Sequence, residues 1–216
     1  LFDCLELLYS ATGGAFNVYQ VPLIREIARY IMRAHVAGGW FINFADASAH
    51  AAPSGDLVFR NARRIADERM QGFGAFCALE LGGGKLRGDS LGRQLPAIFN
   101  YETLRAARPE APLLGDVWLP GIQVMAARVK EGSADGLYIA AQGGHNAESH
   151  NHNDVGNFVV YNDGKPVVID VGVETYTART FSKERYDIWT MQSAYHNLPT
   201  IGGVMQRDGR EFEARD

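Results

Sequence analysis

In the first half of the chain, hydrophobic residues recur every three or four positions, which is the spacing of an amphipathic helix. These stripes stop at glycine pairs or start at residues that favour a first helical turn, such as Pro22 and the candidate N-cap Ser90. The pattern predicts four helices, over residues 1–12, 22–38, 57–81 and 90–107.

The pattern changes near Arg108-Pro109 to short hydrophobic runs. Turn residues separate the runs, as at Asn162-Asp163-Gly164, and this alternation is typical of antiparallel strands. The predicted strands cover residues 117–119, 123–129, 137–142, 157–162 and 167–171. We therefore expect an α+β protein of two parts, a helical part over residues 1–109 and an antiparallel β-sandwich over residues 110–216.

Composition narrows the functional classes only slightly. The 216 residues suffice for one large domain or two small ones, and 46% hydrophobic with 21% charged residues is typical of a folded soluble protein. No apolar run is long enough to span a membrane, and a net charge of −4 argues against nucleic-acid binding. Cys4 and Cys77 are too few for a disulfide framework, so both are interpreted as small buried hydrophobic residues.

Side chains that could take part in catalysis or metal binding are most concentrated in residues 144–154, which contain three of the six histidines. His150 and His152 are two positions apart, so both side chains would point to the same face of an extended segment. Two imidazoles on one face are a natural start for a transition-metal site.

Two further residues could complete such a site. Asp170 follows a run that looks buried, where a carboxylate needs a partner or a metal, and His196 follows later. Two imidazoles and one carboxylate fit a zinc site that leaves one position for water. Each residue also has an ordinary explanation, as a solvated loop histidine, a turn-capping aspartate or a core histidine, so these residues alone leave both interpretations open.

Several longer stretches of the sequence are similar to a known protein family. The sequence resembles the heparinase II/III-like polysaccharide lyases over residues 149–158, 164–166, 169–172, 181–189 and 193–197. Residues 22–27 and 40–47 are similar to the end of that family's helical toroid. The resemblance implies part of an α/α toroid over residues 1–109 and part of a heparinase II/III-like β-sandwich over residues 110–216.

The resemblance also implies an activity and a site. Members of that family cleave acidic polysaccharides, such as alginate or the glycosaminoglycan heparan sulfate, by β-elimination. By residue match, His152, Asp170 and His196 are expected to bind a divalent metal, usually zinc. His150 matches a position that faces the substrate and helps to neutralise the uronate, and Tyr186 is expected near the cleft. We expect the metal to be mainly structural and to hold His150 and residues 176–186 toward the toroid.

The expected catalytic set is incomplete. A lyase removes the C5 proton of a uronate after the carboxylate has been neutralised, and an acid then protonates the leaving oxygen. The family uses an Asn-His pair and a tyrosine of the toroid, and we expect these upstream of residue 1. The implied partner is an acidic polysaccharide, the implied location periplasmic or secreted, and a homodimer stays open. The uronate polymer and endo or exo action are not fixed.

Two other classes remain as alternatives. A cupin-like metal enzyme is suggested by Gly144 and the His150-Asn151-His152 triplet, but the glutamate expected a few residues later is missing. A non-catalytic carbohydrate-binding module would bind the sugar without forming the unsaturated, ultraviolet-absorbing product of a lyase.

Overall fold

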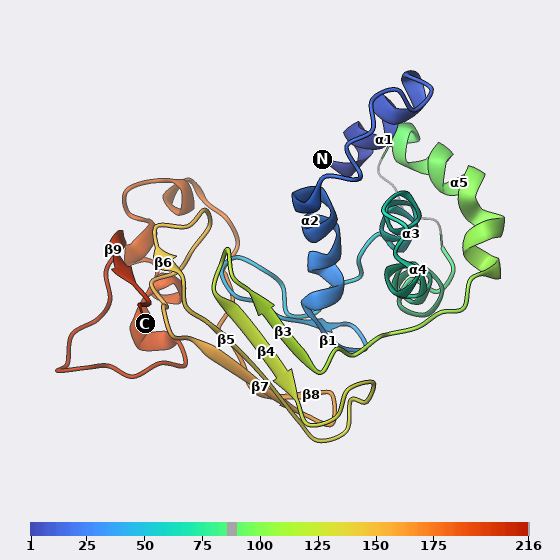
Figure 1. Ribbon diagram of the computed structural model, residues 1–216. Helices are drawn as coiled ribbons and strands as arrows, with labels where there is room; N and C mark the ends of the chain where they lie inside the picture. Colours follow the sequence, from blue (N-terminus) through green and yellow to red (C-terminus); the bar gives the residue numbers. More distant parts are fainter. Residues whose placement is uncertain (86–89, 216) are drawn as a thin grey trace. The chain divides into compact units, whose positions relative to one another are not determined.

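The computed structural model describes residues 1–85 and 90–215 (Figure 1). The chain divides into two compact units. The first, here called the helical unit, combines Leu1–Gly39 with Ala52–Pro112. The second, the β unit, combines Trp40–Ala51 with Leu113–Asp216. The short segment 40–51 therefore folds with residues that lie far along the chain, although its neighbours in sequence belong to the helical unit.

The helical unit is built from amphipathic helices, and its core contains Phe59, Ile65 and Phe73, all of them fully buried. The elements are α1 (Phe2–Ala11), α2 (Pro22–Arg33), β1 (His35–Ala37), α3 (Gly55–Arg64), α4 (Glu68–Ala75), the π-helical turn η1 (Phe76–Leu81) and α5 (Leu91–Ala106). None of the helices in the described part of the chain is both long and apolar enough to cross a membrane.

Two of the predicted helices differ from the structure. The single helix expected over residues 57–81 is wrong, because the chain turns at Ala66, which has a φ of 54°, and a new helix then starts. Asp67 caps that helix, α4, by accepting a hydrogen bond from the Met70 N–H at 3.0 Å. The helix after Pro22 ends at Arg33, earlier than expected, because His35–Ala37 is extended.

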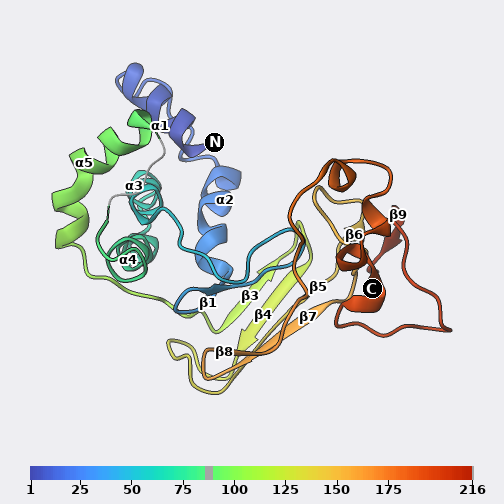
Figure 2. The same cartoon turned by 180° about the vertical axis from the view of Figure 1, so that it is seen from behind.

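The β unit contains a five-stranded antiparallel sheet with the order β3-β4-β5-β7-β8, seen from behind in Figure 2. Alternate residues form its buried face, as expected for a sheet with one face in a core; examples are Ala126, Ala140 and Val159. The strands are β3 (Asp116–Leu119), β4 (Val124–Arg128), β5 (Leu137–Gln142), β7 (Phe158–Asn162) and β8 (Lys165–Val168).

The antiparallel pairing agrees with the expectation from the sequence, but the last strand is shifted. The strand expected over residues 167–171 starts at Lys165 and ends at Val168, so Asp170 lies beyond the sheet rather than in it. A two-stranded sheet pairs β6 (His145–Asn146) with β9 (Gly209–Glu213). The fold is thus mixed α and β with an antiparallel sheet, while the toroid and the complete sandwich stay predictions.

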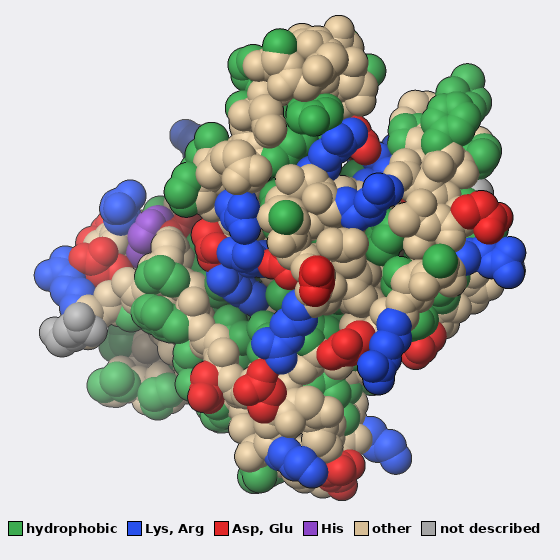
Figure 3. Space-filling model, turned by 45° about the vertical axis from the view of Figure 1, so that its right-hand side comes forward, with side chains coloured by type: hydrophobic (Ala, Val, Ile, Leu, Met, Phe, Trp, Pro, Cys, Tyr) green, Lys and Arg blue, Asp and Glu red, His purple; other side chains and the backbone are tan. Residues whose placement is uncertain are grey.

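The rest of the β unit is irregular chain with four short 3-10 turns between residues 178 and 195. Segment 40–51 adds β2 (Trp40–Phe41), and the Trp40 ring lies 6.2 Å from the ring of Tyr161 on β7. Acidic and basic side chains are interspersed on the face shown in Figure 3, in agreement with the modest net charge.

Candidate metal centre

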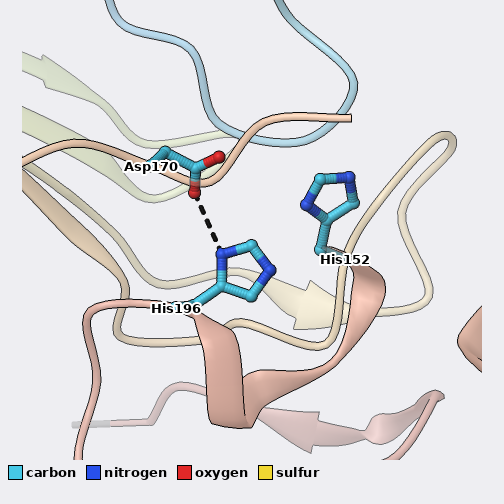
Figure 4. Close-up of side chains that lie close together, drawn as sticks. All are labelled: His152, Asp170 and His196. Carbon is cyan, nitrogen blue, oxygen red and sulfur yellow. Dashed lines mark hydrogen bonds and ion pairs between the residues drawn. The ribbon is translucent and has the colours of Figure 1, made fainter. Parts of the chain in front are cut away.

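The three residues expected to bind a metal are brought together by the irregular parts of the β unit. His152 lies between β6 and β7, Asp170 follows β8, and His196 follows the 3-10 turn η5 (Ser193–Tyr195). Their ligand atoms all lie within 4.8 Å of one another (Figure 4). All three residues are buried, which is unusual for ionisable side chains without a partner or a metal.

The hydrogen bonds of His196 assign its protons. Its Nε2 lies 3.0 Å from the Thr190 carbonyl oxygen, which can only accept, so Nε2 carries a hydrogen. Its Nδ1 faces the Asp170 carboxylate at 3.0 Å. In the neutral ring Nδ1 is itself an acceptor, so a proton or a cation has to lie between these two atoms.

The protonation of this pair responds to both burial and pairing. Burial lowers the pKa of His196, but the contact with Asp170, the charge of Asp154 and the Thr190 carbonyl together outweigh this effect, and the net pKa is raised. Burial raises the pKa of Asp170, but the contact with His196, together with hydrogen bonds from the Gly172 N–H and the Asn157 amide, outweighs it, so that this pKa is lowered. Both shifts favour the imidazolium–carboxylate form of the pair.

His152 offers a lone pair to the same space. Its Nε2 lies 3.1 Å from a carboxylate oxygen of Asp46, so Nε2 carries the hydrogen of the neutral ring. Burial lowers the pKa of His152, which keeps the ring neutral near pH 7. Its Nδ1 is buried and has no hydrogen-bond partner among the described residues. An orphaned nitrogen beside Asp170 and His196 fits a metal ligand.

A second carboxylate lies next to the cluster. Asp154 Oδ2 is 3.8 Å from His196 Nδ1, and burial raises the pKa of Asp154 to about 6. The side-chain amide of Asn157 donates to Asp154 at 3.0 Å and to Asp170 at 2.5 Å. Asn157 is completely buried, and its two hydrogen bonds hold both carboxylates in place.

Asp46 also belongs to this site, although the sequence analysis did not place it there. It comes from segment 40–51, yet its carboxylate accepts hydrogen bonds from four side chains of the irregular loops. These are His150 Nδ1 at 2.9 Å, His152 Nε2 at 3.1 Å, Tyr176 OH at 2.8 Å and an Arg185 nitrogen at 2.9 Å. Burial alone would raise the pKa of Asp46, but these four bonds outweigh it and lower the pKa to about 2.

The two residues expected to face the substrate have different surroundings. The His150 side chain is 54% exposed and stacks on Tyr176, with ring centroids 6.4 Å apart. Tyr186 is half-buried, and its hydroxyl donates to Asn151 Oδ1 at 2.7 Å. The structure thus brings His150 next to the cluster, whereas the Tyr186 hydroxyl is engaged with another side chain. Tyr176, also missed, presents an exposed ring beside His150.

This donor set fits a divalent metal. The atoms that could hold it are His152 Nδ1, His196 Nδ1 and an Asp170 oxygen. Each imidazole donates a hydrogen bond from its other nitrogen to a neighbouring oxygen. Such neighbouring acceptors typically fix the orientation of metal-bound histidines. Two imidazoles and one carboxylate are a combination that zinc accepts.

A comparison with protein families agrees with this part of the chain. Residues 121–214 match the family model described as Heparinase II/III-like, C-terminal. The match confirms the resemblance to this polysaccharide lyase family and identifies residues 121–214 as a heparinase II/III-like C-terminal segment. All three residues of the cluster lie within the matched segment, and Asp46 lies outside it. No curated protein matches the chain.

Proposed function

We propose that the protein is a polysaccharide lyase that cleaves a uronic-acid-containing polysaccharide by β-elimination and holds a divalent metal, with zinc as the best chemical match, at His152, Asp170 and His196. One observation carries the proposal: three buried ligand atoms converge beside an exposed histidine, within a segment that matches the heparinase II/III-like family. A periplasmic or secreted location belongs to the same proposal.

His150 is the residue of this chain best suited to contact the substrate. Its Nδ1 is held by Asp46, which leaves Nε2 for a ligand. The protonated ring would donate from Nε2 to a uronate carboxylate and so favour loss of the C5 proton, whereas the neutral ring would accept from a sugar hydroxyl. The exposed ring of Tyr176 beside it offers a flat face for a sugar.

The metal ligands are suited to a structural role. A bound metal would supply a fixed positive charge and would link three segments of irregular chain. The ligand residues are buried, whereas His150 is exposed, so the chain separates the group that holds the loops from the group that meets the sugar. Asn157 and Thr190 add the neighbouring hydrogen bonds that keep the ligands in position.

The metal assignment can be tested with His152→Ala. The variant should lose bound metal, and its thermal midpoint should fall to that of the chelator-treated wild type, because ligand binding and folding are coupled. Metal content is measured by elemental analysis and the midpoint by circular dichroism. His50→Ala is the matched control, since His50 is an exposed histidine of the same unit. Unchanged metal content and midpoint in His152→Ala would show that the assignment is wrong.

The lyase activity is tested by incubating a form of the protein that includes the sequence upstream of residue 1, where the catalytic Asn-His pair and tyrosine are expected, with alginate, heparan sulfate and a neutral polysaccharide. A lyase produces an unsaturated uronate, so ultraviolet absorbance should rise with the acidic polymers only. The same rise should be weaker in a His150→Gln variant. Saturable binding of uronate polymers without any rise in absorbance would favour the carbohydrate-binding module instead.

A further inference from the structure

We propose that Asp46 is a positioning residue that joins the metal site to the substrate-facing side chains by fixing which nitrogen of each histidine carries the proton. The inference rests on the proposed metal centre, but it concerns a residue outside the segment that matches the family. Asp46 belongs to segment 40–51, which is separated from the two histidines by about a hundred residues of chain.

The four hydrogen bonds divide between the two carboxylate oxygens. Oδ1 accepts from His152, the metal-side histidine, and from Arg185. Oδ2 accepts from His150, the exposed histidine, and from Tyr176. An ionised carboxylate accepts about four hydrogen bonds, so the acceptor capacity of Asp46 is filled. The positive charge of Arg185 also balances that of Asp46, and it offsets the cost of burying an ionised carboxylate with only 6% side-chain exposure.

This arrangement determines what each histidine presents to its surroundings. A carboxylate cannot donate, so the nitrogens that face Asp46 carry hydrogens, namely Nε2 of His152 and Nδ1 of His150. His152 consequently turns the lone pair of Nδ1 toward Asp170 and His196. His150 consequently keeps Nε2 for the substrate side. A carboxylate behind a histidine ligand commonly acts in this way in metalloproteins.

The backbone next to Asp46 supports a positioning role. Ala45 has a φ of 60°, a left-handed conformation that costs a residue with a Cβ about 1–2 kcal/mol. Segment 40–51 closes on itself through a hydrogen bond from the Phe41 N–H to the Ala49 carbonyl at 2.9 Å. Strained backbone that is held in place by its surroundings is characteristic of functional positions.

The first test compares the zinc affinity of the wild type with that of Asp46→Asn. An amide has one acceptor oxygen, so it cannot serve both pairs of donors. Competition with a coloured chelator should show zinc affinity reduced about 10- to 100-fold, the usual effect of removing such a partner. The control is Asp116→Asn, because Asp116 is an exposed aspartate on β3, and its affinity should equal that of the wild type.

The second test separates positioning from a general structural role. Thermal midpoints are measured for the wild type and Asp46→Asn, each in excess chelator and in excess zinc. A purely structural residue would lower both midpoints by the same amount, and that result would overturn the proposal. A positioning residue reduces the rise that zinc produces, and Asp46→Glu, which keeps the charge, should recover part of that rise.

The third test needs no variant and no metal, so it applies even if Asp46→Asn does not fold. In the metal-free, ¹⁵N-labelled wild type, the His152 ring should show a protonated Nε2 and an unprotonated Nδ1, assigned by through-bond correlation. The opposite tautomer would overturn the role of Asp46. A wild type that binds no zinc but shows the expected tautomer would remove the metal centre and leave the link between Asp46 and His152 supported.

Discussion

At the scale of single residues, His150 and His152 differ in burial and are therefore suited to different roles. His150 and His152 are two positions apart and hydrogen-bond the same carboxylate, as a shared face would require. Their chain is nevertheless a loop rather than a strand, and one side chain is 54% exposed while the other is completely buried. The buried ring is therefore available only to other residues or to a small ion, and the exposed ring is available to a large substrate.

The Asn157 amide donates to two buried carboxylates of the site. Asn157→Ala would leave Asp154 and Asp170 without their shared donor in a buried environment. Because each unsatisfied buried polar group costs about 1–3 kcal/mol, the free energy of unfolding in chelator should fall by at least that amount. Urea denaturation measures it, with Asn162→Ala, an exposed asparagine on β7, as the control. Equal stability of the two variants would show that the amide is not needed.

The sequence indicated part of this site and left out the rest for a physical reason. His152 stands out in a histidine-rich loop and Asp170 at the end of a hydrophobic run, and the family resemblance groups both with His196. Asp46 lies in a stretch that resembles the family's toroid, but no sequence signal links it to the histidines, since its partners are distant in sequence and neither periodicity nor local spacing connects them. Only the return of segment 40–51 to the β unit brings it to the histidines.

At the scale of elements, hydrophobic periodicity located the helices better than their ends. The expected helix over residues 90–107 corresponds closely to α5 (Leu91–Ala106), with Ser90 at its N-cap position. The expected helix over residues 57–81 is interrupted, because the hydrophobic stripe continues through the turn at Ala66. The only local sign of the break is Asp67, a good N-cap residue whose role depends on its partners.

The cap of α4 leads to a pH-dependent prediction. Asp67 accepts from the Met70 N–H and pairs with Arg29 at 2.7 Å. Burial raises the pKa of Asp67, but these contacts outweigh it, and the net pKa is lowered. A lowered pKa contributes stability above the unfolded-state value of about 3.9 and loses it as the pH falls through the folded-state value.

Asp67→Ala should therefore lower the free energy of unfolding by about 0.5–2 kcal/mol at pH 7, and by progressively less as the pH falls below about 4. Urea titrations across this pH range measure the difference. Glu102→Ala, which removes an exposed carboxylate of α5, should show no comparable loss at any pH. A loss that stays constant down to acid pH would indicate that the charge of Asp67 does not matter.

Close packing of α3 against α4 gives a second prediction at this scale. A Cβ at Gly74 would lie 2.5 Å from the backbone nitrogen of Phe59. Because Phe59 is part of the neighbouring helix α3, its backbone cannot move away easily. Gly74→Ala should therefore destabilise the protein by about 1–3 kcal/mol or more. Gly92→Ala in α5 is the matched control, because the nearest atom among the described residues to its new Cβ would be Ser90 Oγ, 3.9 Å away. That variant should be as stable as the wild type or up to about 1 kcal/mol more stable.

At the scale of the whole molecule, the β unit is assembled from distant parts of the chain. Segment 40–51 joins residues beyond 112, and the three candidate ligands come from three separate loops. The last strand of the five-stranded sheet, β8, ends at Val168, before Asp170 and His196. Much of the C-terminal chain therefore has few ladder hydrogen bonds to hold it, and a metal would link segments that the sheet does not.

This dependence predicts that zinc stabilises the wild-type protein by mass action. A metal that binds only the folded state adds RT ln(1 + [L]/Kd), so each tenfold rise in free zinc above Kd adds about 1.4 kcal/mol. For a chain of this size, the thermal midpoint should rise by about 3–6 °C per tenfold step. Magnesium at the same concentrations is the control, because it prefers oxygen ligands and should leave the midpoint unchanged at a site with two imidazoles. Equal effects of the two ions would point to nonspecific binding at surface carboxylates, whereas a rise with zinc alone that disappears in His152→Ala would locate the effect at the buried cluster.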